Sequence, residues 1–433
     1  MKERILFPDG TPVPDDLLEK ELPSLEDLGP VWDLRAQGIV PGPRVQTREI
    51  QAVIDRARAE GGGVVAVSGG TFVSGSLYFP RGVHLYLAED GVLMGSDRVS
   101  DYDLRETRIE GESCLYFSAL INADHADGFT LMGPGTVDGN GQRAWEAFWL
   151  RRKWNPACTN KDEQRPRLLY VSHSEGVNVC GATLKNAHFW TTHFYRCRRV
   201  RVIGCTITSP ATPVPAPSTD AIDLDACEEV LIRGCTLSVN DDAIALKGGK
   251  GLQADRQPEN GPVERVLIEK CDFGFSHSCL TCGSEAIHCR NILMRDCTVR
   301  GATNVLRLKM RPDTPQHYEE ITVERVTGKA AQMLNVHAWS QFADPAEPPA
   351  PPSLAERITM RDCELVCDRA VDLDPEERGV IARDFCLEGI RIRAREEGFP
   401  PERLGDLYPG SKVEDTEIRL CPQQPRIQTM EIL

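Results

Sequence analysis

Two adjacent aspartates, Asp241 and Asp242, stand directly before the alternating segment AIALK at residues 243–247. Neighbouring carboxylates raise the free energy of ionising one another, so one of them is expected to hold a proton at a higher pH than usual. Acid–base hydrolysis uses such a pair, because one carboxyl donates a proton while another activates water. Taken alone, adjacent aspartates more often form a solvated turn, so other polar segments must decide the interpretation.

Three further segments carry polar residues where the surrounding pattern would permit apolar ones. They are STDAIDLD with Asp220, FSHSCLTCGSE with His277, and LRLKM with Arg307 and Lys309. The arginine and the lysine alternate along a short apolar strand, so both point to one face and can bind a carboxylate. Lys247, after the aspartate pair, is a further candidate for that role.

A loose internal repeat runs through most of the chain. Its copies are MGPGTVDG, VNVCGATLKN, VRVIGCTITS, VLIRGCTLSV, VLIEKCDFGF, ILMRDCTVRG, ITVERVTGKA and ITMRDCELVC. Aligned on one small or apolar residue in each copy, they are 47, 23, 30, 36, 26, 29 and 37 residues apart, at Gly135, Ala182, Cys205, Cys235, Cys271, Cys297, Val326 and Cys363. Each copy alternates V, I or L with polar residues, which is typical of a strand.

Short strands repeating at this spacing, with no helical pattern between them, predict an all-β solenoid, the parallel β-helix. The main alternative, a β-propeller, needs longer repeats and the hairpin turns that are mostly missing here. On a parallel coil, equivalent positions of successive turns lie about 4.8 Å apart. We therefore expect the four polar segments to meet in one open groove.

The repeat also predicts how the chain is organised. Residues 47–61 place Ile50, Val53, Ile54 and Ala57 on one helical face, with Thr47 as the N-cap. Such a helix would cover the open end of a coil, which every solenoid must protect. We predict a single domain over 1–433, with an N-terminal segment and capping helix at 1–62, the coil at 63–393 and a C-terminal tail at 394–433.

Composition limits the classes of partner. A formal net charge of -15 disfavours nucleic acid and anionic membranes, which require clustered Lys and Arg. The sequence contains no apolar stretch long enough to span a membrane and begins without a signal-peptide pattern, so the cytoplasm is the expected location unless a leader has been removed. Most of the 16 cysteines recur within the repeat, which predicts buried thiols and not disulfides. Oligomeric state stays open.

The ordered segments STD, NDD, SHS and RLK resemble the motifs NTD, DD, GHG and RIK of glycoside hydrolase family 28, the polygalacturonase family. GPGTVDGNG and the GSE that follows the histidine extend the similarity, which spans roughly residues 45–330. The resemblance implies a right-handed parallel β-helix and an inverting hydrolase. It implies that Asp241 is the general acid, that Asp220 and Asp242 activate water, and that His277 sets the protonation of the acid.

By the same resemblance, Arg307 and Lys309 bind the carboxylate of a galacturonate unit. Ser218 replaces the asparagine of NTD, and Ser276 and Ser278 replace both glycines of GHG, so the subsite that reads the sugar hydroxyls is expected to differ. We expect an exo-acting polygalacturonase or galacturonidase that takes pectic oligosaccharides. Another pectic exo-hydrolase, such as a rhamnogalacturonan hydrolase or a rhamnohydrolase, is the alternative.

Two other classes of protein remain to be distinguished: a β-helical lyase, which forms an unsaturated product, and a non-catalytic carbohydrate-binding solenoid. No cofactor or metal is expected. A zinc site at His277, Cys279, Cys282 and Cys289 is disfavoured, because the segment reads as a strand and a second Cys-x-x-Cys is missing.

Overall fold

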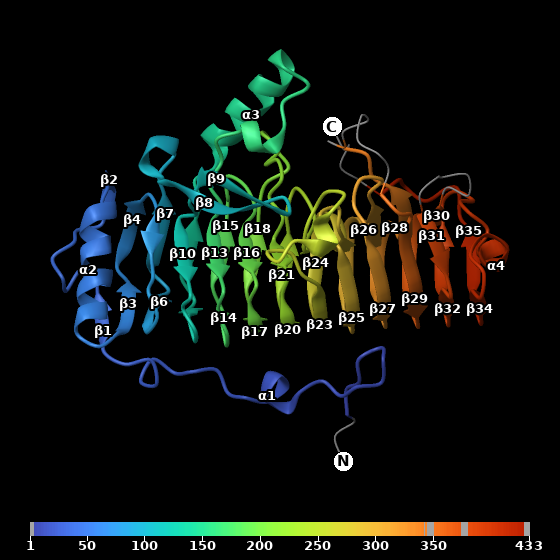
Figure 1. Cartoon of the computed structure of the whole chain (residues 1–433), viewed down its shortest axis with the longest axis horizontal. Coiled ribbons are helices and arrows are strands. Elements are labelled where there is room, and N and C mark those ends of the chain that lie inside the picture. Colours follow the sequence, from blue (N-terminus) through green and yellow to red (C-terminus); the bar gives the residue numbers. More distant parts are fainter. Residues whose placement is uncertain (1–3, 342, 344–349, 374–379, 428–433) are drawn as a thin grey trace. The chain divides into compact units, whose positions relative to one another are not determined.

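The computed structural model describes residues 4–341, 343, 350–373 and 380–427 of the 433-residue chain. The chain divides into two compact units. One comprises Met1–Pro14, Glu110–Glu112 and Leu224–Leu433, and the other comprises Asp15–Ile109 and Ser113–Asp223. Each unit is a coil of short parallel strands (Figure 1), so the all-β parallel coil predicted from the repeat is confirmed in both.

The unit that contains Asp15–Ile109 has three parallel ladders. The first holds β1 (Val31–Asp33), β3 (Gly63–Val67), β6 (Val83–Leu87), β11 (Thr130–Met132), β14 (Asn178–Cys180) and β17 (Arg198–Ile203). The second holds β2 (Gly42–Val45), β4 (Gly70–Ser74), β7 (Gly91–Gly95), β12 (Thr136–Asp138), β15 (Thr183–Lys185) and β18 (Thr206–Thr208). The third holds β5 (Leu77–Tyr78), β10 (Ile121–Asp124), β13 (Leu169–Ser172) and β16 (Thr192–Tyr195).

The unit that contains Leu224–Leu433 has longer strands. One ladder holds β20 (Glu228–Arg233), β23 (Val263–Glu269), β25 (His288–Arg295), β27 (His317–Glu324), β29 (Ser353–Arg361), β31 (Val380–Arg383), β32 (Cys386–Glu388) and β34 (Lys412–Glu414). The other holds β21 (Thr236–Ser238), β22 (Ile244–Lys247), β24 (Asp272–Cys282), β26 (Thr298–Met310), β28 (Thr327–Ala338), β30 (Glu364–Leu373), β33 (Arg391–Ala394) and β35 (Glu417–Leu420). The strand β19 (Ile222–Asp225) lies at the boundary of the two units.

The register of the coil follows the alignment of the repeat within each unit. The N–H of the residue after one aligned position donates to the carbonyl of the aligned position one turn earlier, at 2.9–3.1 Å for Asp272 to Cys235, Thr298 to Cys271, Thr327 to Cys297, Glu364 to Val326 and Arg391 to Cys363. Thr206 donates in the same way to Ala182, at 3.0 Å. Residues aligned by sequence are therefore direct neighbours on successive turns.

The aligned cysteines are buried, and all 16 cysteines of the chain are free thiols, so the prediction of thiols in place of disulfides is confirmed. Cys235, Cys271 and Cys297 are at most 2% exposed and lie on consecutive turns. Their sulfurs contact backbone carbonyls, for example Cys297 Sγ to Arg295 O at 3.1 Å. A small, soft side chain suits this position because the turns leave little room between equivalent residues.

A residue with left-handed backbone geometry precedes each aligned position in this part of the coil. The φ angles are 51° to 63°, at Gly234, Lys270, Asp296, Arg325, Asp362 and Gly389. Residues with a β-carbon lose roughly 1–2 kcal/mol in this conformation. The ladders on both sides of the corner fix the backbone there, so the coil tolerates this cost at every turn.

The helix α2 (Thr47–Ala59) packs against the first strands of its unit through Ile50, Val53, Ile54 and Ala57, as predicted. Its cap differs from the prediction. Gln46 is the N-cap residue, and Thr47 begins the helix and accepts a hydrogen bond from Gly75 N–H at 2.7 Å. The hydroxyl of Thr47 is used to tie the helix to the coil, which a local sequence pattern does not reveal.

The coil extends beyond both expected limits. β1 and β2 precede α2 and pair with β3 and β4, so the segment before residue 63 already forms coil strands. At the other end, β34 pairs with β32 and β35 pairs with β33, so the segment assigned to a tail adds another turn. These strands were missed because each is only three or four residues long.

The other short elements are α1 (Asp15–Leu18), α3 (Gln142–Trp154), α4 (Leu404–Leu407), the 3-10 turns at Val99–Asp101, Asn160–Asp162, Ala254–Arg256 and Pro401–Arg403, and the β8 (Leu104–Ile109) and β9 (Glu112–Phe117) pair. None of the helices in the described ranges has the length and hydrophobicity needed to cross a bilayer.

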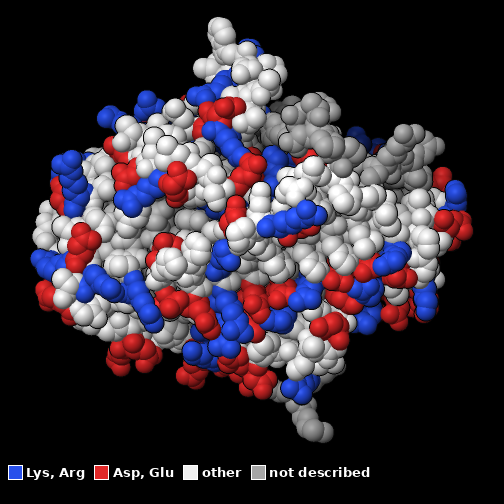
Figure 2. All heavy atoms as spheres, in the orientation of Figure 1, with Lys and Arg blue, Asp and Glu red and all other residues white. Residues whose placement is uncertain are grey.

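The outer face of the β20–β29 ladder alternates charges from one turn to the next. The register places Arg233, Glu269, Arg295, Glu324 and Arg361 side by side on consecutive strands. Glu269 accepts from Arg233 Nε at 2.6 Å and from Arg295 Nη2 at 2.8 Å. Figure 2 shows acidic and basic side chains intermixed along this face. Alternation stabilises a stack in which like charges would repel.

The cysteine stack gives a test of the packing. Replacing Cys271 by Leu adds volume between two fixed turns and should lower the free energy of unfolding by about 1–3 kcal/mol. The matched control, Cys421→Leu at a partly exposed position, should change it by less than about 0.5 kcal/mol. Thermal and urea unfolding midpoints measure both changes. Equal midpoints for the two variants would show that the stack is not tightly packed.

Candidate active site

The predicted aspartate pair lies between two strands that pair with the same neighbour. β21 and β22 both pair with the long strand β24, and a short loop at residues 240–242 lies between them, with His277 N–H donating to Asp241 O at 2.9 Å. The loop is fixed at both ends, since Val239 N–H donates to Phe275 O and Ala243 N–H donates to Ser278 O, each at 2.8 Å. Because β24 continues through this region, its His277 lies directly beside the loop.

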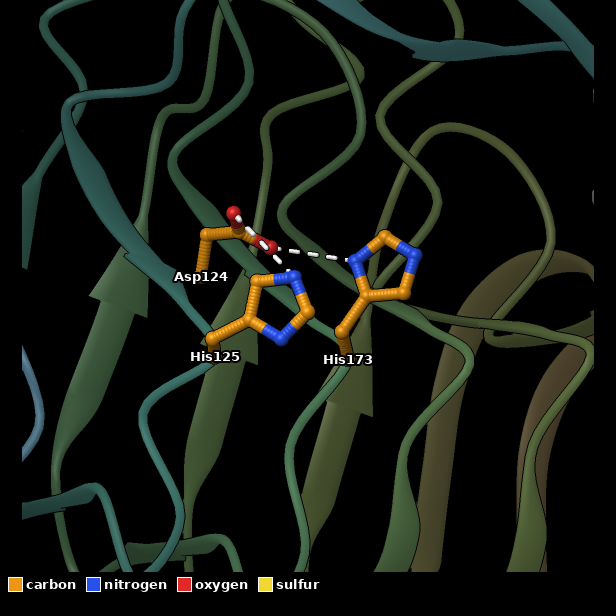
Figure 3. Close-up of side chains that lie close together, drawn as sticks. All are labelled: Asp124, His125 and His173. Carbon is orange, nitrogen blue, oxygen red and sulfur yellow. Dashed lines mark hydrogen bonds and ion pairs between the residues drawn. The ribbon is translucent and has the colours of Figure 1, made fainter.

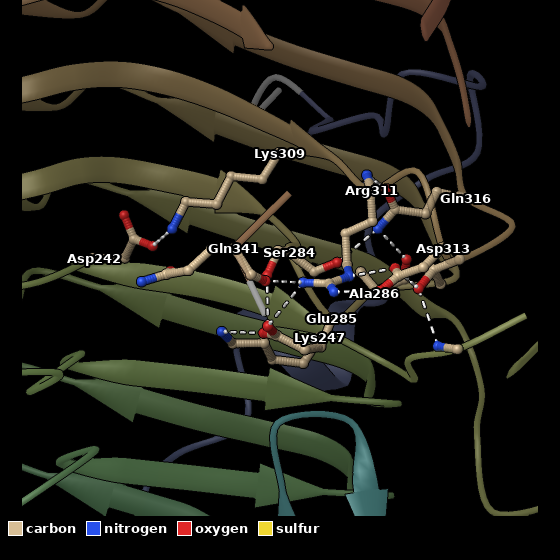
Figure 4. Close-up of polar contacts among 12 residues, drawn as sticks. Asp242, Lys247, Ser284, Glu285, Ala286, Lys309, Arg311, Asp313, Gln316 and Gln341 are labelled. Atoms are coloured by element: carbon tan, nitrogen blue, oxygen red, sulfur yellow. Dashed lines mark hydrogen bonds and ion pairs between the residues drawn. The ribbon is translucent and has the colours of Figure 1, made fainter. Parts of the chain in front are cut away.

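The structure brings Asp241, Asp242, His277 and Lys309 together. Asp241 Oδ1 lies 3.0 Å from His277 Nδ1 and accepts a hydrogen bond from the Asp242 backbone N–H at 2.9 Å. Lys309 Nζ on β26 donates to Asp242 Oδ2 at 2.7 Å (Figure 4). The sequence-predicted residues of this unit therefore form one cluster in which each carboxyl has its own basic partner.

The protonation of the pair differs from the expectation. Burial raises the pKa of both carboxyls, but the charge and hydrogen bond of His277 at Asp241, and the charge of Lys309 at Asp242, outweigh burial and hold both pKa values below the usual range. The expectation of a raised pKa counted the mutual repulsion and omitted these partners. With Asp241 ionised, His277 Nδ1 must carry the hydrogen in their contact, because a carboxylate only accepts.

Two buried polar atoms of the cluster have no hydrogen-bond partner among the described residues. They are Asp242 Oδ1 and His277 Nε2. Leaving such an atom unsatisfied costs about 1–3 kcal/mol. Native structures keep few of these atoms, and those they keep are frequently at functional sites. Both atoms are thus available to a water molecule or to a substrate.

Arg307 and Lys309 point to one side of β26, as their alternation predicted. The guanidinium carbon of Arg307 and the Nζ of Lys309 each lie 4.9 Å from the centre of the Trp339 ring. Burial lowers the pKa of Arg307. The indole holds both cations in place by cation–π attraction and leaves a positive site beside Asp242.

Trp339 and the residues around it were not recognised from the sequence. The register pairs Arg307 with Asn335 and Lys309 with His337, and the next turn pairs Asn335 with Asp372. Asn335 Nδ2 donates to Asp372 Oδ2 at 3.0 Å. The sequence could have revealed these residues through the repeat, because Asn335, His337 and Asp372 on β28 and β30 occupy positions equivalent to those of Arg307 and Lys309 on β26.

Lys247 lies in a buried ion-pair cluster, and its predicted contact with a substrate stays a prediction. Its Nζ lies 3.1 Å from Glu285 Oε2 inside the coil, and Glu285 is also close to Arg311, which in turn binds Asp313 (Figure 4). Lys247 and Arg311 are at most 5% exposed. Alternation along β22 directs Lys247 to this ion-pair cluster, where Glu285 balances its charge.

Asp220 and Ser218 belong to the other unit. Asp220 is 3% exposed, and its carbonyl accepts a hydrogen bond from Thr191 N–H at 2.8 Å just before β19. Ser218 adopts a left-handed φ of 52° at the end of the Pro-rich loop. The placement of Asp220 beside the aspartate pair, and a substrate contact for Ser218, stay predictions.

The disfavoured zinc site gains no support. Burial raises the pKa of Cys279 and of Cys289 well above its ordinary value. His277 Nδ1 is engaged by Asp241. Asp241, Asp242 and His277 themselves have donor atoms close enough for a cation. The ammonium of Lys309 already supplies positive charge there.

Comparison with known proteins defines the class. The sequence model of Glycosyl hydrolases family 28 matches residues 105–337, more than half of the chain. A probable polygalacturonase of Vitis vinifera is 23% identical over 423 residues, covering 93% of this chain and 75% of the relative. An endo-polygalacturonase of Pectobacterium carotovorum subsp. carotovorum is 26% identical over 252 residues, covering 56% of this chain and 59% of the relative.

Solved structures share the fold. The exopolygalacturonase of Thermotoga maritima, described as hyperthermoactive, aligns over 94% of this chain and 95% of its own with a TM-score of 0.72 and 17% identity. The polygalacturonase of Erwinia carotovora ssp. carotovora covers 88% and 95% with a TM-score of 0.66 and 19% identity. The chain belongs to glycosyl hydrolases family 28. It is a glycoside hydrolase with the right-handed parallel β-helix that the motif resemblance predicted.

The buried ion-pair cluster gives a second test. Glu285→Gln leaves Lys247 and Arg311 without their shared carboxylate, and breaking a buried pair costs about 3–5 kcal/mol of stability. Burial raises the pKa of Glu285, but the charges of Lys247 and Arg311 outweigh burial and lower it. As the pH falls, the unfolded chain therefore takes up this proton first, and the stabilisation present above the unfolded pKa of about 4.3 is lost below it.

Unfolding midpoints at pH 7 and near pH 3.5 measure this effect. The difference between wild type and Glu285→Gln should be large at pH 7 and smaller at the lower pH. Glu417→Gln, at an exposed pair with Arg419, serves as the control and should have little effect at either pH. A difference that does not change with pH would contradict the assignment.

Proposed function

We propose that the protein is an inverting, exo-acting hydrolase of pectic oligosaccharides that contain galacturonate. The observation that carries the proposal is the cluster of Asp241, Asp242, His277 and Lys309 beside Arg307. Two carboxyls with different basic partners and a site for an anionic sugar are the groups that such a reaction requires. The names of the relatives, which are polygalacturonases, support the same substrate class.

In this mechanism Asp241 is the general acid. A bound sugar displaces water from Asp241, and the loss of solvation favours its neutral form. Asp241 then takes up a proton from solvent and donates it to the glycosidic oxygen as the bond breaks, while the attacking water loses its proton to the base. His277 Nδ1 stays hydrogen-bonded to Asp241 at 3.0 Å. His277 is a positioning residue, which is hydrogen-bonded to Asp241 and orients its carboxyl.

Asp242 is the base, together with Asp220. Lys309 keeps Asp242 ionised, and its unsatisfied Oδ1 is free to accept a hydrogen bond from the attacking water. Inverting enzymes hold the acid and base carboxyls about 6.5–9.5 Å apart so that a water fits between base and sugar. Neighbouring Asp241 and Asp242 leave little space for that water, so by the motif resemblance we assign Asp220 a share in activating it.

Arg307 and Lys309 recognise the sugar carboxylate. A guanidinium binds a carboxylate through two parallel hydrogen bonds, and the fixed position on Trp339 reduces the entropy lost on binding. The local positive charge also overcomes the repulsion expected between an acidic substrate and a chain of net charge -15.

The Pro-rich loop at residues 208–218 is held in place within its own unit. Trp149 Nε1 of α3 donates to Pro215 O at 2.7 Å, and Arg165 Nη1 donates to Pro217 O at 2.6 Å, directly before Ser218. Exo-action is proposed because one similar solved structure is named an exopolygalacturonase.

The reaction itself tests the proposal. Oligogalacturonides should be shortened by one unit at a time, and proton NMR should show the released sugar first as the β-anomer, since the α-bond is inverted. Asp241→Asn, Asp242→Asn and Asp220→Asn should each lower kcat by about 10²–10⁴-fold. Asp296→Asn, which breaks an exposed pair with Arg325, is the matched control and should keep kcat. Mixed internal fragments would refute exo-action, and an ultraviolet-absorbing product would point to a lyase.

A second candidate, a hydrolase of rhamnogalacturonan oligosaccharides, is favoured by Asp372. Its carboxylate lies two turns from Arg307 in the same row, about 10 Å along the coil. Hydrogen bonding by His337 lowers the pKa of Asp372, despite the opposing effect of burial, so it is ionised. A carboxylate there repels a uronate and accepts a neutral sugar such as rhamnose.

Asp372→Asn tests this candidate. Removing a repulsion of about 1 kcal/mol should raise kcat/KM for a galacturonate trimer about fivefold and leave kcat/KM for a rhamnogalacturonan oligosaccharide nearly unchanged. The ratio of the two values, measured for wild type, Asp372→Asn and the Asp296→Asn control, separates the two sugars. An unchanged ratio would remove Asp372 from specificity and favour the homogalacturonan substrate.

A further inference from the structure

Asp124, His125 and His173 form a polar cluster on the surface of the other unit. Asp124 ends β10 and pairs in register with Ser172, the last residue of β13. His125 and His173 therefore follow equivalent positions on adjacent turns, and both adopt a left-handed φ, of 50° and 49°. Figure 3 shows both rings turned toward the carboxylate of Asp124.

The donor atoms have the separations that a metal ion requires. Asp124 Oδ1 lies 3.0 Å from His173 Nδ1, and Asp124 Oδ2 lies 3.9 Å from His125 Nε2. One donor atom from each residue can be chosen so that all three lie within 4.8 Å of one another. Ligands at zinc bond lengths of 2.0–2.1 Å in a tetrahedron are about 3.4 Å apart, so small side-chain rotations complete the site.

The surroundings hold two of the ligands in position. Ser172 Oγ donates to Asp124 Oδ1 at 2.7 Å, and the ring of His173 packs edge-on against Tyr195 with 5.2 Å between ring centres. The two imidazoles stack with their centres 4.9 Å apart and their planes at 12°. Such supporting contacts orient metal ligands and reduce the entropy lost when an ion binds.

A second histidine pair shows what distinguishes this cluster. His288 and His317 also stack, with ring centres 5.0 Å apart, and His288 Nε2 lies 2.8 Å from Glu319 Oε1. There, however, Arg357 pairs with both Glu319 and Glu356, so the negative charge is already compensated. In the part of the chain that the structure describes, Asp124 has no ion pair with lysine or arginine.

We propose that Asp124, His125 and His173 bind a divalent transition-metal ion, with water completing its coordination. Two imidazoles and one carboxylate match the ligand preference of zinc. The side chains are 37–74% exposed, so an ion reaches them without any opening of the fold. A bound ion links two successive turns of the coil and should stabilise them against unfolding. The site is independent of the proposed hydrolysis.

Zinc titration of the whole purified protein, stripped with EDTA and assayed against a chromophoric chelator at pH 7.5, tests the proposal. One equivalent should bind and raise the unfolding midpoint. His125→Ala, His173→Ala and Asp124→Asn should each weaken binding at least tenfold, while His288→Ala, the control from the other stacked pair, should not. Circular dichroism should show that these surface variants keep the fold.

Two further readouts separate this site from other ligands. Cobalt(II) should bind without the charge-transfer absorption of a thiolate, because the proposed site contains no cysteine. Binding should weaken below about pH 6, where histidine takes up a proton. The proposal is overturned if the chain binds no equivalent of zinc, if binding survives in His125→Ala and His173→Ala, or if Asp241→Asn and not Asp124→Asn removes it.

Discussion

The in-register parallel hydrogen bonding of successive turns is the constraint on which the structure depends. Each backbone bond from one turn to the next fixes which side chains share a face and sets their spacing at about 4.8 Å. The chain keeps this register through loops of different length, as in the 36-residue step from Cys235 to Cys271 and the 26-residue step from Cys271 to Cys297. The left-handed corner residues are a local cost of keeping this register, and the small buried thiols fit the narrow space between equivalent residues.

Because this register stacks equivalent residues on successive turns, charged side chains in each row need neighbours of opposite charge. On the outer face, arginine and glutamate alternate from β20 to β29, so neighbours attract. Inside, Glu285 balances Lys247 and Arg311. At Asp124 the row carries two histidines and a carboxylate without an arginine among the described residues, and that difference makes the cluster a candidate for a metal ion.

At the candidate active site, the residues that balance the buried charges are also those of the proposed catalytic cluster. His277 and Lys309 stabilise two carboxylates that would otherwise be too costly to bury side by side. Their charges lower the pKa of both carboxyls, so both are ionised.

The family's four motifs were recognisable in the sequence because their order is set by the coil and their residue types by the reaction. The repeat likewise determined the parallel strands and, through the aligned residues, the register within each unit. Short strands at both ends escaped notice, since three or four residues carry too little periodicity to be distinguished from loop.

The partners of the predicted residues were decided by the tertiary structure. Asp242 and Lys309 are 67 residues apart, and nothing local indicates that their contact lowers the carboxyl pKa. Lys247 looked like a basic residue of the groove until the fold placed it against Glu285. Sequence therefore determined which chemistry the chain carries and the order in which its turns stack. The protonation of each group and the availability of each charge depend on distances between turns, and only the folded coil fixes those distances.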